Sequence, residues 1–166
     1  MELAEAAAHA DALAREPGNE RELATLRAQW DDELEAAARS SDYRVRGQAF
    51  RAIGQFRFRQ KLELIRRGLE DESAAARGSA LIALTALSAD HPGDVNAYRA
   101  ALNELAMRDP NPAVRRLAMA CLRNGTPDRG TIQLLEGIAA DDETDREVRE
   151  TARSVAAALV KKARAK

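Results

Sequence analysis

Apolar residues recur along this chain at helical spacing, and no stretch shows the strict alternation typical of a strand. The recurrences are three, four and seven residues apart, which places the side chains on one face of a helix. Eight such stripes follow one another within residues 20–160. Clusters of Pro, Gly, Ser, Asp and Asn separate most of them. An Ala-rich helix is predicted before them, over about residues 3–15. The pattern predicts nine helices and no strand.

The eight later helices form four pairs, because one short motif recurs in the second helix of each pair. The motif is a Val or Ala, then Arg, and then Ala three residues after the Arg. Its arginines are separated by 31, 38 and 34 residues, a period typical of helical repeats. The four copies are Val45–Ala49, Ala76–Ala80, Val114–Ala118 and Val148–Ala152. The first helices of the pairs are predicted from apolar stripes over Leu23–Leu34, Leu62–Leu69, Val95–Leu105 and Ile132–Ile138.

The third copy of the motif carries a family resemblance. Its sequence, Asp109-Pro110-Asn111-Pro112-Ala113-Val114-Arg115 followed by Ala118, resembles the HEAT-repeat signature, and the other copies are weaker versions of it. The resemblance implies an all-α fold, a right-handed α-solenoid in which stacked pairs bury faces that one pair cannot bury alone. We expect a single HEAT-repeat domain over 1–166. It would comprise a capping helix (1–18), about four HEAT-like helix pairs (20–160) and a basic tail (161–166).

The four motif arginines have two interpretations. In the HEAT family this arginine commonly bonds to the Asp side of a neighbouring repeat and stiffens the stack. The alternative is a ladder of arginines that grips phosphates. We favour the structural role. The residues concerned are Arg46, Arg77, Arg115 and Arg149.

Composition narrows the class of protein. A single Cys excludes an internal disulfide framework and fits a reducing compartment. The net charge of −1 gives no overall attraction to nucleic acid or to a membrane surface. The longest strongly apolar run, Ala80–Leu84, is too short for a membrane span, and the acidic start is unlike a signal peptide. We therefore expect a soluble cytoplasmic protein, and the abundance of Ala and Arg with little Lys suggests a bacterial source.

Charge is unevenly distributed along the chain. Residues 1–42 carry 4 basic and 11 acidic side chains, whereas residues 43–67 carry 8 basic and 1 acidic. A turn at Gln55–Gln60 interleaves aromatic and basic residues, which suits an acidic protein surface or phosphates with stacked bases. The alternative is a solvated helix face that the acidic first helices balance. The predicted basic patch comprises Arg44, Arg51, Arg57, Arg59, Arg66 and Arg67.

Equivalent positions in the repeats suggest an apolar strip. Phe50, Leu81 and Met119 each lie four residues after a motif arginine. In HEAT-like stacks the second helices line the concave surface, so this strip could receive a helix of a partner. The alternative is that these residues form the core between repeats, and we favour the core for Leu81.

No catalytic motif occurs in the sequence. It has no G-x-S-x-G, phosphate-binding loop, dinucleotide fingerprint or H-E-x-x-H. Cys121 fits a small buried hydrophobe, and Trp30-Asp31-Asp32 is an aromatic–carboxylate cluster whose Trp lies on an apolar stripe. We expect no metal and no cofactor.

The sequence thus predicts a non-catalytic scaffold that presents a helical surface to a protein partner whose identity it does not specify. One alternative is nucleic-acid binding, because the repeats resemble those of HEAT-like alkylpurine DNA glycosylases. Another is a lyase or chaperone-like subunit, because they equally resemble the HEAT-like phycobilin lyase subunits.

Overall fold

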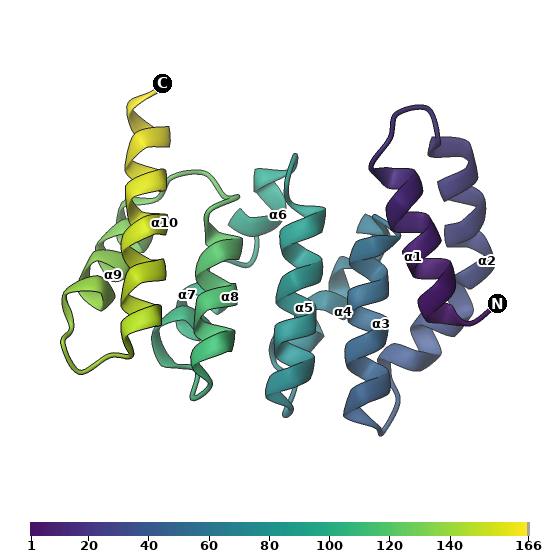
Figure 1. Cartoon of the computed structure of the whole chain (residues 1–166), viewed down its shortest axis with the longest axis horizontal. Helices are drawn as coiled ribbons and strands as arrows, with labels where there is room; N and C mark the ends of the chain where they lie inside the picture. Colours follow the sequence, from purple (N-terminus) through teal and green to yellow (C-terminus); the bar gives the residue numbers. More distant parts are fainter. Residues whose placement is uncertain (166) are drawn as a thin grey trace. The chain divides into compact units, whose positions relative to one another are not determined.

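The computed structural model describes residues 1–165, and all regular structure within them is helical (Figure 1). The predicted all-α fold of helix pairs is confirmed. The helices are α1 (Leu3–Ala14), α2 (Glu20–Ala38), α3 (Tyr43–Gln55), the 3₁₀ turn η1 (Arg59–Lys61), α4 (Leu62–Leu69), α5 (Ala74–Leu87), α6 (Pro92–Asn96), α7 (Arg99–Arg108), α8 (Pro112–Leu122), α9 (Arg129–Ala140) and α10 (Arg146–Arg164).

The chain divides into two compact units, Met1–Leu87 and Ser88–Lys166. The expectation of a single domain over 1–166 stays a prediction. Of the predicted basic tail, Lys161 to Arg164 form the end of α10, while Lys166 lies outside the described residues.

In the first unit α3 is central, and it packs against α1, α2 and α5, while α4 packs against α5. Figure 1 shows α1, α3 and α5 side by side. The helices α3 and α5 approach closely because Gly54 has no side chain: a Cβ there would lie 2.7 Å from the Cα of Ala83. Ile53, Ile65 and Leu84 fill the buried interior. Each fully buried side chain of this kind contributes about 1.5–3 kcal/mol.

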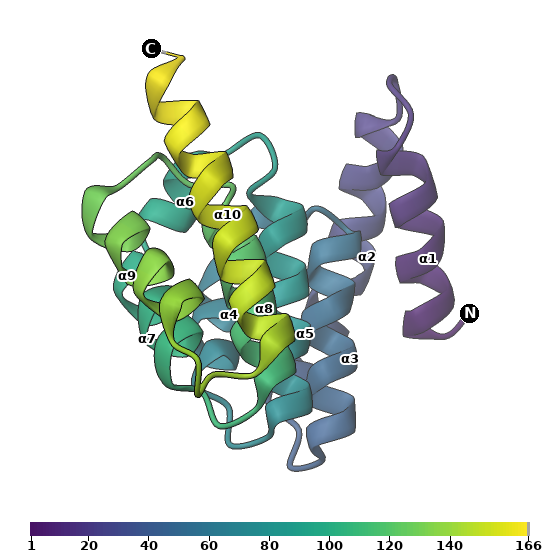
Figure 2. The ribbon, with the colours of Figure 1, turned by 60° about the vertical axis from the view of Figure 1, so that its left-hand side comes forward.

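The second unit is built from α6 to α10. Helix α8 packs against α7 and α10, and α9 lies beside α10 (Figure 1 and Figure 2). Side-chain caps begin its main helices. Asn111 accepts a hydrogen bond from the Ala113 N–H at 2.8 Å, Asp128 from the Thr131 N–H, and Asp145 from the Glu147 N–H. Such caps satisfy backbone donors that the first helical turn leaves unpaired.

One predicted helix is broken, which raises the number to ten α-helices in residues 1–165. The apolar stripe Val95–Leu105 predicted a continuous helix, but α6 ends at Asn96 and α7 begins at Arg99. Hydrogen bonds to a distant loop hold both sides of the break. The Asn96 side chain accepts from the Thr126 N–H at 3.0 Å, and Arg99 donates to the Thr126 carbonyl at 2.9 Å. These tertiary bonds outweigh the local apolar spacing.

Candidate functional site

Arg46 and Asp71 join neighbouring helix pairs in the first unit. The Arg46 Nε and Nη2 donate to the two carboxylate oxygens of Asp71 at 2.7 and 2.9 Å, and its Nη1 donates to the Ser40 carbonyl. The Asp71 side chain is only 7% exposed. The hydrogen bond from Arg46 is the main reason that the pKa of Asp71 lies below its ordinary value, and the Ser73 N–H lowers it further. This bidentate ion pair is stronger and geometrically more specific than a pair joined by one hydrogen bond.

The other three motif arginines also lie against their own helix pairs. Arg77 donates to the Asp71 carbonyl at 2.9 Å, and the Arg115 Nε donates to the Ala106 carbonyl at 2.9 Å. Arg149 lies 3.7 Å from Asp142, and its buried Nε has no hydrogen-bond partner among residues 1–165. These contacts favour the structural role over a ladder that grips phosphates.

The predicted apolar strip is not at the surface, and this prediction is wrong. Phe50 is 3% exposed, and Leu81 and Met119 are 0% exposed. The physical reason is clearest at Phe50, whose ring would lie 2.9 Å from a Cβ at Gly68 and therefore packs on α4. In the first three motif copies the position four residues after the arginine points into its unit, so it offers no contact area to a partner.

Carboxylates lie within 3.0 Å of Arg57 and Arg66, two of the six arginines in the predicted basic patch. The Arg57 Nη1 donates to Asp11 at 3.0 Å and to the Gly54 carbonyl at 2.8 Å, and Arg66 pairs with Glu63 at 2.7 Å. Lys61, in the same segment, bonds to Glu35 at 2.8 Å, and this bond lowers the pKa of Glu35.

The turn that follows α3 is a packing feature. Arg57 has a left-handed backbone with φ 52°, and Phe56 and Phe58 on either side of it are buried. The expected exposed junction of aromatic and basic residues is therefore wrong, because both rings point into the core. Arg59 begins η1, and Arg67 lies at the surface of α4 beside a separate hollow.

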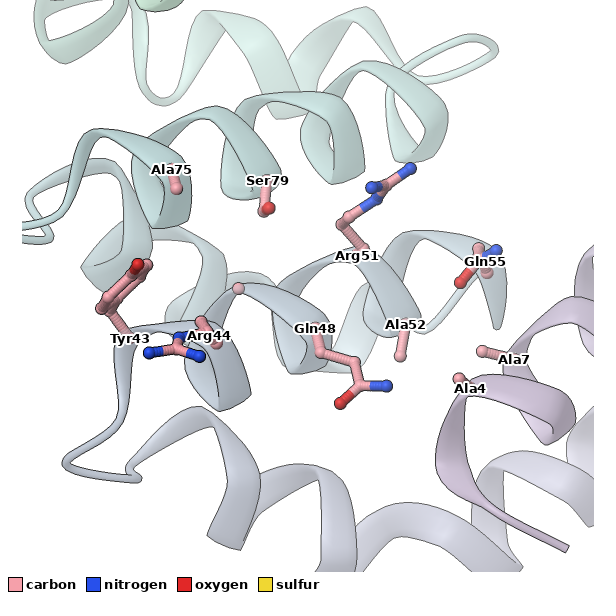
Figure 3. Close-up of a pocket in the computed structure, with 11 residues that line it drawn as sticks. Ala4, Ala7, Tyr43, Arg44, Gln48, Arg51, Ala52, Gln55, Ala75 and Ser79 are labelled. Carbon is pink, nitrogen blue, oxygen red and sulfur yellow. The ribbon is translucent and has the colours of Figure 1, made fainter.

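Arg44 and Arg51 differ from the rest of the patch, because both line a hollow of about 490 Å³ in the first unit. They lie seven residues apart on α3, which is two helical turns or about 10.5 Å along the axis. Figure 3 shows α3 between α5, which carries Ala75 and Ser79, and α1. We call this hollow the arginine groove. Its lining is Ala4, Ala7, Tyr43, Arg44, Gly47, Gln48, Arg51, Ala52, Gln55, Ala75 and Ser79.

The lining of the arginine groove contains no carboxylate. Within the described residues Arg51 has no ion-pair or hydrogen-bond partner for its side chain. Arg44 is 79% exposed, 4.0 Å from Asp42, and its guanidinium lies 5.6 Å from the centre of the Tyr43 ring. The groove thus presents two cationic groups that remain available to a ligand.

Sequence reasoning selected Arg44 and Arg51 but missed Gln48, Gln55 and Ser79. A usable signal was present, because Arg44, Gln48, Arg51 and Gln55 are spaced by four, three and four residues and so share one helical face. Net charge over a segment does not reveal this spacing. Ser79 comes from α5 and depends on tertiary packing, since a Cβ at Gly47 would lie 3.3 Å from its Oγ.

The other candidate residues named from the sequence do not come together in one site. Trp30 is buried and its Nε1 has no partner among residues 1–165, whereas Asp31 bonds to Lys61. Cys121 is buried. Within the described part of the chain, no group of three or more His, Cys, Asp and Glu side chains could hold a metal ion. None of the described helices has the length and apolar character needed to cross a membrane.

Comparison with known proteins supports the repeat interpretation. Residues 32–104 match the family model of HEAT repeats, and no curated protein gives a significant match to the sequence. The matched segment starts within α2 and ends within α7, so it contains the motif copies of Arg46 and Arg77. Over residues 32–104 the chain is therefore similar to HEAT repeats, as the motif predicted.

Proposed function

We propose that this protein is a non-catalytic protein-interaction module whose arginine groove binds an acidic segment of a partner protein. HEAT repeats are commonly protein-interaction scaffolds. The observation that carries the proposal is the pair Arg44 and Arg51, which face one hollow whose lining has no carboxylate. The proposed setting is the cytoplasm of a bacterium.

The groove suits an acidic peptide in three respects. Two arginines about 10.5 Å apart match acidic residues two turns apart on a helix, or about three residues apart in an extended segment. Gln48 and Gln55 offer amides that can donate to and accept from a peptide backbone. The alanines of α1, α3 and α5 supply a shallow apolar floor. Cationic groups at such a surface also speed the encounter with an acidic partner.

Two observations favour a protein over nucleic acid. Phe56 and Phe58 are buried, so they form no platform on which bases could stack. Arg46 and Arg57 are held by Asp71 and Asp11, which leaves the segment with few arginines for phosphates. No described residue of the groove favours the lyase or chaperone-like alternative.

The test is a fluorescence-anisotropy titration with a labelled helical peptide that carries Glu at every seventh position, and with its Gln counterpart. We expect the Glu peptide to bind more tightly, and the double variant R44E/R51E to weaken that binding by roughly tenfold or more. The matched control is R21E/R67E, which reverses two exposed arginines outside the groove and changes the net charge equally. We expect this control to bind within roughly threefold of the wild type.

Equal effects of the two double variants would overturn the groove as the binding site. The same titration with labelled duplex and single-stranded DNA tests the other class of partner. If DNA binds tightly and R44E/R51E abolishes that binding, the partner of the arginine groove is nucleic acid and not an acidic protein. Circular dichroism of each variant checks that its helices are intact.

A further inference from the structure

A second hollow continues the arginine groove within the first unit. It has a volume of about 260 Å³ and shares Arg51 and Gln55 with the groove. Figure 3 shows these two side chains toward the end of α3 that lies away from Tyr43. We call it the isoleucine hollow, because Ile82 of α5 lines it. The groove and the isoleucine hollow meet at Arg51, so one ligand can occupy both.

The contacts between α3 and α5 fix how the two helices are aligned. A Cβ at Gly47 would lie 3.7 Å from the Cα of Ala76, and a Cβ at Gly54 would lie 2.7 Å from the Cα of Ala83. The two glycines are seven residues apart, and so are the two alanines. The helices α3 and α5 therefore run in the same direction with matched register.

This register places Ile82 just beyond the second arginine of the groove. Ile82 comes directly before Ala83, so it lies level with the residue before Gly54. That level is about 3 Å beyond Arg51 along the helix axis. Ile82 is 42% exposed, and Ala86 lines the hollow one turn further along α5. An aliphatic side chain of a ligand in the turn beyond Arg51 would remove apolar surface of Ile82 from water.

The charges of the isoleucine hollow do not oppose an acidic ligand. Asp11 is its one carboxylate, and it already pairs with Arg15 at 2.9 Å and with Arg57 at 3.0 Å. Both of these arginines line the hollow, together with Arg51. Three arginines and one aspartate leave the lining with a net positive charge.

The spacing of Arg44 and Arg51 favours a helical ligand over an extended one. The two arginines are about 10.5 Å apart along α3. Two residues seven positions apart on a helix have the same separation and lie on one face. In an extended segment this span covers about three residues, and their side chains alternate in direction, so two acids would face opposite sides. A helix is therefore the ligand whose two carboxylates reach both arginines.

Resting on the proposed function, we propose that the partner's acidic segment is a helix with a leucine or isoleucine about one turn beyond the acid that pairs with Arg51. This aliphatic side chain binds in the isoleucine hollow against Ile82. The arginines attract acidic helices in general, whereas the isoleucine hollow favours those with an aliphatic residue at this position. Ile82 is thus a residue that determines specificity.

Fluorescence anisotropy with three labelled helical peptides tests this proposal. All carry Glu at seven-residue spacing. One has Leu four residues after the last Glu, one has Leu four residues before the first Glu, and one has Ala at both places. The two Leu peptides cover the two directions in which a helix can lie in the groove. We expect one of them to bind roughly threefold to tenfold more tightly than the Ala peptide.

The variant Ile82→Ala should remove most of this gain and leave the affinity for the Ala peptide within roughly twofold of the wild type. The matched control is Met107→Ala, which shortens another exposed apolar side chain, 37% exposed and located in the second unit. It should leave the gain unchanged. Circular dichroism checks that both variants are folded.

Three results would overturn the proposal: no gain with either Leu peptide, an equal gain with both, and a gain that persists in Ile82→Ala. The proposed function stands in each of these cases if R44E/R51E still weakens binding of the Ala peptide. If none of the three peptides binds, the proposed function fails and this inference fails with it.

Discussion

The two units carry equivalent surfaces with different charge. In the first unit, α1, α3 and α5 form the arginine groove, whose lining contains Arg44 and Arg51 and no carboxylate. In the second unit, a hollow of about 520 Å³ on α8 and α10 has Arg123, Glu147 and Glu150 as its charged lining residues, and Arg116 pairs with Glu147. Arg44 and Glu147 each lie two residues before a motif arginine. The repeats thus carry different charges at equivalent exposed positions, so any specificity for a partner lies at those positions.

The largest effect should come from the closest helix contact in the first unit. Gly54→Ala places a methyl group 2.7 Å from the Cα of Ala83, and neither backbone can move without separating α3 from α5. We expect a loss of about 2–3 kcal/mol in the free energy of unfolding. Urea denaturation followed by circular dichroism measures it.

The matched control lies in the second unit. Gly137 is also inside a helix, but nothing lies within 4 Å of a Cβ placed there. Gly137→Ala should therefore stabilise the protein by about 0.4–1 kcal/mol, because alanine restricts the unfolded chain and favours helix. Equal effects of the two substitutions would show that helix propensity, and not the contact with Ala83, decides the outcome at Gly54.

An intermediate effect is expected from acid. The pKa of Asp71 is lower in the folded protein, mainly because Arg46 bonds to its carboxylate. The pair therefore contributes its full stability above the unfolded pKa, and loses that contribution as pH falls through the lower folded pKa, below about pH 4. Urea midpoints of the wild type and Asp71→Asn, measured from neutral pH down to pH 3, should converge at the acid end. A constant difference across this range would contradict the assignment.

The smallest effect on stability is expected at the second unit's exposed ion pair. Glu147 is 70% exposed and pairs with Arg116, so Glu147→Arg should change the free energy of unfolding by no more than about 0.5 kcal/mol. The substitution also makes this surface resemble the arginine groove. We expect the affinity for the Glu peptide to rise by roughly twofold to threefold, measured by the same anisotropy titration. Unchanged affinity would show that charge alone does not account for the difference between the two surfaces.

The spacing of apolar residues in the sequence was sufficient to predict the helices, because it shows which face of each helix is buried. It was not sufficient where residues far apart in the sequence determine the packing. Nothing near Phe50 in the sequence shows that Gly68 of α4 leaves room for its ring, and the count of basic residues over 43–67 does not show that Asp11 pairs with Arg57. The break between α6 and α7 likewise depends on Thr126, a residue of a later loop. Arg51 was predicted as a site residue from the excess of basic residues over 43–67. That no carboxylate lines the groove beside it follows only from the packing of α1, α3 and α5.

The small residues between α3 and α5 also affect how stability varies with temperature. The chain contains 36 alanines, and an alanine removes much less apolar surface from water on folding than a leucine does. Unfolding therefore exposes little apolar surface per residue and has a small change in heat capacity. A small heat-capacity change gives a shallow curve of free energy against temperature, so this protein should keep a similar stability over a wide range of temperature.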